Sequence, residues 1–486
     1  MSLLSALAGI RAGHPIHASL QIAGHTVDSP RRIDVRSPYS GALVGSVPMV
    51  TAADVERALR TAKAWRSPLS RHQRATILLA TAERLRAASE AVSDLISAES
   101  GLSKADTRYE VGRACDVFTF AAHEALRDDG ATFSCDITPH GRSRKVFTTR
   151  EPLLGVISAI TPFNHPLNQV AHKVAPAIAS NNRMVLKPSE KTPLSALLLA
   201  EILRDAGLPA EMFTVLTGDP ADIAAPLLSA AEVDLVSFTG GVAVGKQIAA
   251  RAVYKRQVLE LGGNDPLIVM EDADLDEAAA LAASGSYKNS GQRCTAIKRI
   301  LVQETVAAPF IARLVENTLA VRHGDPFDEC NSMGTVIDEA AAIAIEARVS
   351  DAIARGARLL CGHQRNGALY APTVLDRVDP SWPLVAQETF GPVSPVIRFR
   401  DIDEAIAIVN AVPYGLSSAV CTNRMDWITR FVRELQVGTV NIREVPGYRL
   451  ELTPFGGIKD SGLGYKEGVL EAIKGFTNLK TWSLPW

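Results

Sequence analysis

The chain has 486 residues and a formal net charge of −2, with 47% hydrophobic and 21% charged residues. This composition excludes a disordered chain, and the length predicts a globular protein of two or three domains. The near-neutral charge, without a Lys/Arg block, excludes a nucleic-acid-binding protein, because phosphate binding needs a basic face.

The six cysteines form no CxxC pair and show no metal-ligand spacing. They are too few for a disulfide scaffold, so we expect no metal site and a reduced, cytoplasmic setting. The apolar stretch at residues 1–10 lacks a basic flank and is too short to cross a bilayer, and no run of 18 apolar residues follows. We therefore expect no membrane partner.

Two helices are predicted near the start of the chain, at residues 51–65 and 70–86, where apolar residues recur at helical spacing. Both begin with a capping-box pattern, as Thr51 with Asp54 does in the first. These helices precede a change of pattern.

From residue 153, short apolar runs alternate with helical segments, which predicts a parallel, doubly wound sheet. A helix is expected over residues 193–206, capped by Thr192 and ended by Gly207. The strands are expected at residues 153–160, 183–186, 213–216, 234–238 and 257–261.

A second such series runs from residue 266 to 440 and predicts a second α/β domain, with strands at residues 297–303, 393–399 and 417–422. Residues 131–150 are polar and alternating around a Pro-His-Gly turn, which predicts a protruding hairpin, and the tail from residue 473 alternates likewise. Because exposed two-stranded ribbons are marginal alone, we expect these segments to pair with another subunit.

Polar and glycine residues gather where the strands of the first series end. Asn164 follows the first strand and Lys187 the second, Gly240 and Gly241 follow the fourth, and Glu260 ends the fifth. Ligands bind beyond the carboxyl ends of strands in open α/β sheets. The sequence therefore predicts a ligand site at this edge.

Two of these segments admit two interpretations each. The glycine turn at residues 239–241 opens a helix and could bind phosphate through backbone N–H groups, but it does not follow GxGxxG and could be a tight turn. Lys187 and Glu190 could face a ribose or form a solvated pair.

Cys294 lies in a small, polar loop, Ser-Gly-Gln-Arg-Cys-Thr. A lone cysteine is usually a buried small hydrophobe. Here the flanking glycine, glutamine and Arg293 favour access and a stabilised thiolate. We therefore predict a reactive thiol at Cys294 and assign no role to the other cysteines.

Together these segments resemble the aldehyde dehydrogenase superfamily over almost the whole chain. The matching pieces, in the family's order, are TPFNHP (161–166), KPSE (187–190), FTGGVAVG (238–245), ELGGN (260–264), GQRCT (291–295), ETFGP (388–392) and PFGGIKDSG (454–462). Other stretches, such as EVPGYRLE (444–451), most resemble the branch that oxidises phosphonoacetaldehyde.

The resemblance implies two doubly wound parallel-sheet domains plus a protruding β-ribbon. It implies a NAD-binding domain at residues 1–130 and 151–259, a catalytic domain at residues 260–465 and an oligomerisation ribbon at residues 131–150 and 466–486. The expected assembly is a homodimer or homotetramer.

The resemblance also implies site roles. Cys294 is the nucleophile, Glu260 is the general base, and the Asn164 amide with the Cys294 N–H forms the oxyanion hole. The implied cofactor-binding residues are Thr161, Phe163, Lys187, Glu190, Gly240, Gly241, Gly245 and Glu388. Gly241 departs from the serine that many relatives carry, so backbone donors must serve there.

The Glu190 carboxylate should repel a 2′-phosphate, so we expect NAD as cofactor, with weaker use of NADP. For the substrate, Arg113, His165, Arg293 and Arg449 are expected to converge near the thiol and to leave uncompensated positive charge unless the substrate is an anion. We expect oxidation of phosphonoacetaldehyde to phosphonoacetate. Alternatives are non-phosphorylating oxidation of glyceraldehyde 3-phosphate, oxidation of succinate semialdehyde, or a catalytically silent structural or binding protein.

Overall fold

The first sheet is five-stranded and parallel throughout, in the order β10-β9-β8-β11-β12. Its strands are β8 (Val156–Ile160), β9 (Met184–Lys187), β10 (Phe213–Val215), β11 (Val233–Thr239) and β12 (Arg256–Glu260). The structure is a computed structural model that describes residues 2–485. Residues 1 and 486, the ends of the predicted domain ranges 1–130 and 466–486, lie outside the described residues. The predicted doubly wound sheet is confirmed, and its apolar strands are almost entirely buried.

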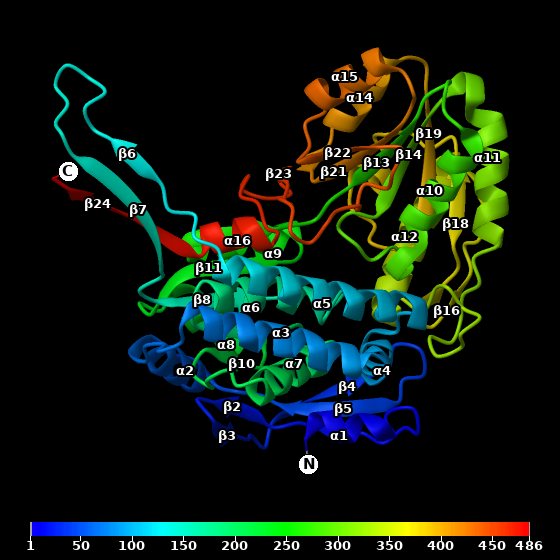
Figure 1. The fold of residues 1–486 in the computed structure, drawn as a ribbon. Helices are drawn as coiled ribbons and strands as arrows, with labels where there is room; N and C mark the ends of the chain where they lie inside the picture. Colours follow the sequence, from blue (N-terminus) through cyan, green and yellow to red (C-terminus); the bar gives the residue numbers. More distant parts are fainter. Residues whose placement is uncertain (1, 486) are drawn as a thin grey trace.

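The second sheet is seven-stranded, in the order β15-β18-β19-β14-β13-β21-β22, and only β15 runs antiparallel to its neighbour. Its strands are β13 (Asp265–Val269), β14 (Ile297–Gln303), β15 (Arg358–Cys361), β18 (Thr373–Asp376), β19 (Val393–Phe399), β21 (Ser417–Cys421) and β22 (Thr439–Ile442). The two sheets lie in separate lobes (Figure 1). The chain passes from one sheet to the other between Glu260 and Asp265, while the predicted domain boundaries stay a prediction.

Helices surround the first sheet, and both predicted capping boxes at its N-terminal pair of helices are formed. The long helix α5 packs against α3 and α6. These helices are α2 (Ala52–Ala64), α3 (Arg71–Ala87), α4 (Ser89–Ser100), α5 (Lys104–Leu126), α6 (Asn168–Ala179), α7 (Leu194–Asp205), α8 (Pro220–Ser229) and α9 (Val242–Arg251).

The remaining elements are short or flank the second sheet. At the N-terminus they are α1 (Leu3–Ala6), η1 (Leu7–Gly9), β1 (Ile16–His17), β2 (Leu20–Ile22), β3 (His25–Val27), β4 (Arg32–Arg36) and β5 (Leu43–Pro48). Around the second sheet they are α10 (Leu275–Tyr287), η2 (Lys288–Gly291), α11 (Glu304–Leu319), α12 (Glu339–Ala354), β16 (Arg365–Asn366), β17 (Leu369–Tyr370), α13 (Pro383–Ala386), α14 (Ile402–Asn410), β20 (Tyr414–Gly415), α15 (Met425–Glu434) and β23 (Ile458–Lys459).

The expected cap of α7 by Thr192 is wrong. No side chain of the same segment caps this helix, and the Glu99 carboxylate from α4 accepts the backbone N–H groups of Leu194 and Ser195 at 2.9 and 3.0 Å. A buried acidic side chain from a neighbouring helix therefore satisfies the free N–H groups at this helix start. Gly207, with φ of 97°, follows the end of α7, as expected.

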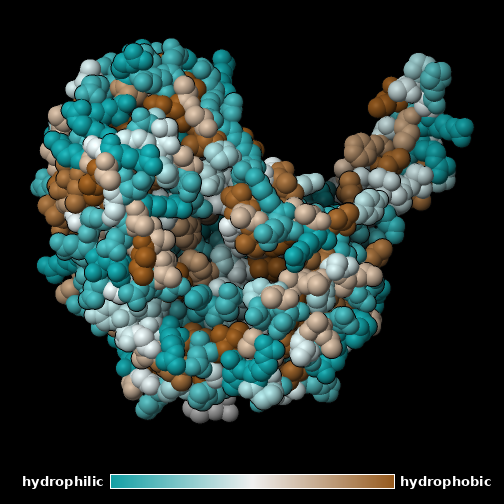
Figure 2. All heavy atoms as spheres, turned by 180° about the vertical axis from the view of Figure 1, so that it is seen from behind, coloured by the Kyte–Doolittle hydropathy of each residue, from teal (hydrophilic) through white to brown (hydrophobic). Residues whose placement is uncertain are grey.

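The predicted hairpin is confirmed and forms a three-stranded ribbon of β6 (Thr132–Ser134), β7 (Lys145–Pro152) and β24 (Thr477–Leu484). β24 pairs antiparallel with β7 along its whole length. The tail becomes a strand only at Thr477, because Val469–Gly475 form α16, which packs on α6. The ribbon projects from the body in Figures 1 and 2, and pairing with another subunit stays a prediction.

Among residues 2–485, no helix combines the length and the apolar character that crossing a membrane would require.

Candidate active site

A cavity of about 210 Å³ lies beyond the carboxyl ends of β8, β11 and β12, on the predicted edge of the first sheet. It brings together the three predicted catalytic residues, Asn164, Glu260 and Cys294, with part of the predicted cofactor set. Its walls are Pro162, Phe163, Asn164, Gln169, Thr239, Gly240, Gly241, Glu260, Leu261, Gly262, Cys294, Glu388 and Phe390.

Lys298, a residue of β14 that was not predicted from the sequence, contacts the backbone of the Cys294 loop. The Lys298 ammonium donates to the backbone carbonyls of Arg293 and Cys294 at 2.6 and 3.0 Å. Lys298 is buried, and its backbone belongs to β14, so the sheet fixes its position. These bonds fix the thiol at the cavity wall.

The Cys294 thiol is not a stabilised thiolate, which corrects the expectation from its sequence neighbours. Burial raises its pKa to about 11, although Lys298 opposes the shift. The Arg293 guanidinium donates to the carbonyl of Gly285 at 2.8 Å. The thiol therefore stays protonated near neutral pH and needs a base.

Asn164 lies in the loop between β8 and α6, with its side-chain amide donating to the Gln292 carbonyl at 2.7 Å. The Glu110 carboxylate holds the end of this loop, because it accepts the N–H groups of Leu167 and Asn168 at 2.8 and 2.9 Å. One N–H of the Asn164 amide remains for a ligand. The loop is thus held at the predicted oxyanion donor and at its end before α6.

Glu260 ends β12, and neither of its carboxylate oxygens has a hydrogen-bond partner in the described part of the chain. Burial and the nearby Glu467 raise its pKa well above the ordinary range. Lys173, which opposes this shift, lies 2.8 Å from Glu467. A buried carboxyl without donors is a basic group once ionised, as a general base requires.

The glycine turn after β11 leaves open space in front of α9. Gly241 is the N-cap of α9. Among the described residues, no side chain caps this helix, and a Cβ on Gly241 would meet no atom within 4 Å. The first N–H groups of α9 can therefore bind phosphate. Gly245 faces Leu261 instead: an added Cβ would come within 2.3 Å of that side chain, so Gly245 permits close packing.

The other predicted cofactor residues flank this space. Lys187 is buried and lies 3.0 Å from the Glu190 carboxylate, whose side chain is 43% exposed, so only the lysine end of the pair is shielded from solvent. The Glu388 carboxylate accepts the N–H of Gly263 at 3.2 Å. Phe163 lines the cavity, whereas the buried Thr161 is not among the residues that line it.

The four predicted substrate residues lie together. Burial and the positive charges of Arg113, Arg293 and Arg449 lower the pKa of His165 well below the ordinary range. Two guanidinium nitrogens, Nε of Arg293 and Nη1 of Arg449, are buried without a hydrogen-bond partner in the described residues. The cluster thus has cationic donors left for a ligand.

The expectation of wholly uncompensated charge is wrong, because Glu451 lies within the cluster. Its carboxylate accepts from Arg113 and contacts His172 Nε2, and it lies 3.8 Å from Arg449. Although burial opposes the shift, His172, Arg449 and Arg113 hold the pKa of Glu451 far below its usual range. Glu451 and His172 meet only in the folded chain, so sequence spacing could not pair them.

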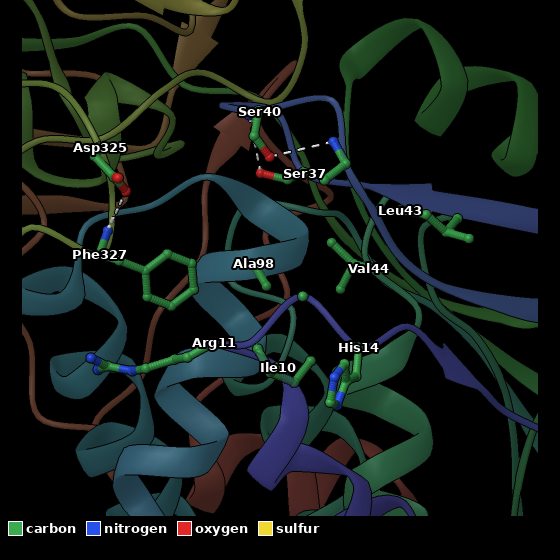
Figure 3. A pocket seen from close by; sticks show the side chains of 12 residues that line it. Ile10, Arg11, His14, Ser37, Ser40, Leu43, Val44, Ala98, Asp325 and Phe327 are labelled. Carbon is green, nitrogen blue, oxygen red and sulfur yellow. Dashed lines mark hydrogen bonds between the residues drawn. The ribbon is translucent and has the colours of Figure 1, made fainter.

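A second cavity, of about 370 Å³, lies near the N-terminus and contains none of the predicted site residues (Figure 3). Arg11, one of its lining residues, is already paired with Asp94 through two hydrogen bonds of 2.8 Å. In residues 2–485, no three His, Cys, Asp or Glu side chains gather in a way that could hold a metal ion.

Comparison with known proteins matches this geometry to one family. The sequence model for the aldehyde dehydrogenase family matches residues 25–482. The 3-sulfolactaldehyde dehydrogenase of Priestia aryabhattai is 36% identical over 94% of this chain and 96% of its own. Two solved structures are similar. A NAD-dependent aldehyde dehydrogenase from Sinorhizobium meliloti is 34% identical, and the match covers 98% of this chain and 96% of that chain with a TM-score of 0.92. A NADP-dependent glyceraldehyde-3-phosphate dehydrogenase from Bacillus halodurans, complexed with NADP, is 37% identical, and the match covers 96% of this chain and 99% of that chain with a TM-score of 0.93.

Proposed function

Because the chain belongs to the aldehyde dehydrogenase family, we propose that it oxidises a small anionic aldehyde to the carboxylate with NAD, and that phosphonoacetaldehyde is its substrate. The observation that carries the substrate proposal is the pair of unpartnered, buried guanidinium nitrogens on Arg293 and Arg449. The presence of Cys294, Glu260 and Asn164 in one cavity argues against a silent member of the family.

The described residues fit a dinucleotide. The open N-terminus of α9 at Gly241 fits a pyrophosphate, and the Lys187–Glu190 pair fits a ribose. Glu388 would hold the second ribose. The exposed side of Glu190 would repel a 2′-phosphate, which supports NAD over NADP. When bound, NAD accepts the hydride of the substrate's aldehyde carbon.

The reaction follows from the three side chains in the cavity. Glu260 takes up the thiol proton, and Cys294 adds to the aldehyde carbon to give a thiohemiacetal. The free N–H of the Asn164 amide and the backbone N–H of Cys294 bind its oxyanion, and loss of one such donor costs about 3 to 4 kcal/mol. After hydride loss, Glu260 releases the thiol proton to solvent, then takes a proton from the water that hydrolyses the thioester and passes it to the departing Cys294 thiolate.

Charge balance supports a phosphonate. Glu451 compensates Arg113, which leaves Arg293 and Arg449 as the cations with free donors, and the two histidines have lowered pKa values. A phosphonate brings up to two negative charges and three oxygens. Each hydrogen bond to a charged group contributes about 1.5 to 3 kcal/mol.

A sulfonate is the second candidate, because the relative from Priestia aryabhattai acts on 3-sulfolactaldehyde and is similar over nearly the whole chain. A sulfonate has the same three-oxygen geometry but a single charge. It therefore brings one negative charge fewer than a phosphonate to the buried donors of Arg293 and Arg449.

The test is to supply purified enzyme and NAD with phosphonoacetaldehyde, sulfoacetaldehyde, glyceraldehyde 3-phosphate and succinate semialdehyde at equal concentrations. We expect the highest kcat/KM with phosphonoacetaldehyde and phosphonoacetate as the product in ³¹P NMR. A higher value with sulfoacetaldehyde supports the second candidate, and the absence of reduced cofactor with every aldehyde contradicts the proposed activity.

A further inference from the structure

Asn289, a residue of η2, connects three parts of the site and is used by no step above. Its backbone has φ of 57°, a left-handed conformation that asparagine and aspartate tolerate better than most residues. Its N–H donates to the Asp106 carboxylate of α5 at 3.0 Å, and its side chain is buried. Asn289 is therefore fixed by a contact from the other lobe.

The contacts of the Asn289 amide determine which way it points. Its Nδ2 lies 2.7 Å from the carbonyl oxygen of Asn164 and 3.1 Å from Nε2 of His165. A carbonyl oxygen only accepts hydrogen bonds, so the atom facing Asn164 must be the amide nitrogen. The second N–H of that nitrogen is then available to His165 Nε2, which accepts it.

This contact places the imidazole proton. A neutral histidine whose Nε2 accepts carries its proton on Nδ1. Burial, Arg113, Arg293 and Arg449 all favour the neutral ring, and only Glu451 opposes them. In the described residues, Asn289 is the only hydrogen-bond partner of the ring, so its Nδ1–H is available to a ligand.

We propose that Asn289 is a positioning residue that fixes His165 as a neutral hydrogen-bond donor, through Nδ1–H, for the anionic group of the substrate. The inference rests on the proposed function in one respect, that the substrate carries an anion. Because the ring stays neutral, it adds a donor without a further cation beside three arginines. The same amide holds the Asn164 backbone, so one side chain aligns the oxyanion donor and the anion donor.

The position of the proton can be tested without any substrate. In enzyme labelled with ¹⁵N-histidine, the ring signal that disappears in His165→Phe identifies His165, and we expect it to show a neutral ring protonated on Nδ1 at pH 7.5. Asn289→Asp keeps the shape and tolerates the left-handed backbone but can only accept, so the proton should move to Nε2. A wild-type ring protonated on Nε2 overturns the proposal.

The consequence for the substrate is measured by a double-mutant cycle. We expect Asn289→Asp to lower the ratio of kcat/KM for phosphonoacetaldehyde to kcat/KM for propanal about tenfold, and to change that ratio less than twofold when His165 is already Phe. Asn366→Asp adds the same charge at an exposed position of β16 and should leave the ratio unchanged.

If Asn289→Asp lowers the kcat/KM ratio equally in the wild type and in His165→Phe, Asn289 acts through Asn164 alone. That result overturns the role assigned to His165. A wild-type enzyme that prefers propanal contradicts the proposed function instead. In that case the NMR result still decides the positioning role: an Nδ1 proton that moves in Asn289→Asp supports it, and any other pattern overturns it.

Discussion

The Cys294 thiol has a raised pKa, about 11, because it is buried, so its reactivity before ligands bind should be low near neutral pH. We expect the rate of iodoacetamide modification at Cys294 in cofactor-free enzyme to keep rising up to about pH 10. A free thiol levels off near its pKa of about 8.5. Mass spectrometry of the Cys294 peptide measures this rate, and Cys294→Ser identifies the peptide.

A plateau in this rate below pH 8.5 would show a thiolate that is already stabilised. The residue-level account of the free enzyme would then be wrong, and the need for a base at the addition step would disappear.

Within residues 2–485, the two carboxylate oxygens of Glu260 have no hydrogen-bond partner, and we propose Glu260 as the base for thioester hydrolysis. Glu260→Gln keeps the volume but cannot take a proton, so hydrolysis should slow more than hydride loss. We expect a burst of reduced cofactor in rapid mixing, followed by a steady state at least about a hundredfold slower than in the wild type. Wild-type rates in both phases would rule out the base role.

Glu110 links a helix start to the site, because its carboxylate accepts the first N–H groups of α6 just after the Asn164 loop. Burial raises its pKa from 4.5 to about 7. A carboxyl with a higher pKa in the folded than in the unfolded state binds its proton more tightly when folded. Its contribution to stability is therefore complete below pH 4.5 and is lost as pH rises to about 7.

Glu110→Gln keeps an acceptor for the helix but does not titrate. We expect the difference in Tm, variant minus wild type, to become more positive between pH 5 and pH 7.5, as measured by differential scanning fluorimetry. Parallel Tm curves over this range would show that Glu110 does not titrate there.

The sequence predicts elements well where the information is local. β14 and β19 have the predicted bounds, and the capping box at Thr51 forms, because strand runs and capping boxes depend on neighbouring residues. The cap of α7 was predicted wrongly, since its acceptor, Glu99, comes from another helix. For the same reason, no sequence pattern indicated the contact of Glu451 with Arg113.

At the scale of the whole molecule, the ribbon projects from the body of the protein (Figure 1). Trp482 of β24 stacks on Phe147 of β7 with ring centroids 4.5 Å apart, and Trp482 stays 42% exposed. Apolar residues are visible along the projecting arm in Figure 2. An exposed apolar ribbon face of this kind is typical of an assembly surface.

We therefore expect the wild type to be a dimer or tetramer in light scattering coupled to gel filtration, and Trp482→Asp to give a smaller species. Ser483→Asp places the same charge at the adjacent position, on the opposite face of the strand, and should keep the wild-type mass. A monomeric wild type would contradict the ribbon's predicted role.

At the scale of the whole site, we propose that residues of both lobes bind the anionic group of an aldehyde substrate. The most direct measurement is the ratio of kcat/KM for phosphonoacetaldehyde to kcat/KM for propanal in the wild type, Arg293→Ala and Arg449→Ala. We expect a wild-type ratio above one that falls about tenfold or more in each variant, since each lost charged hydrogen bond is worth about 1.5 to 3 kcal/mol. A wild-type preference for propanal, or variants that lose both substrates equally, would contradict it.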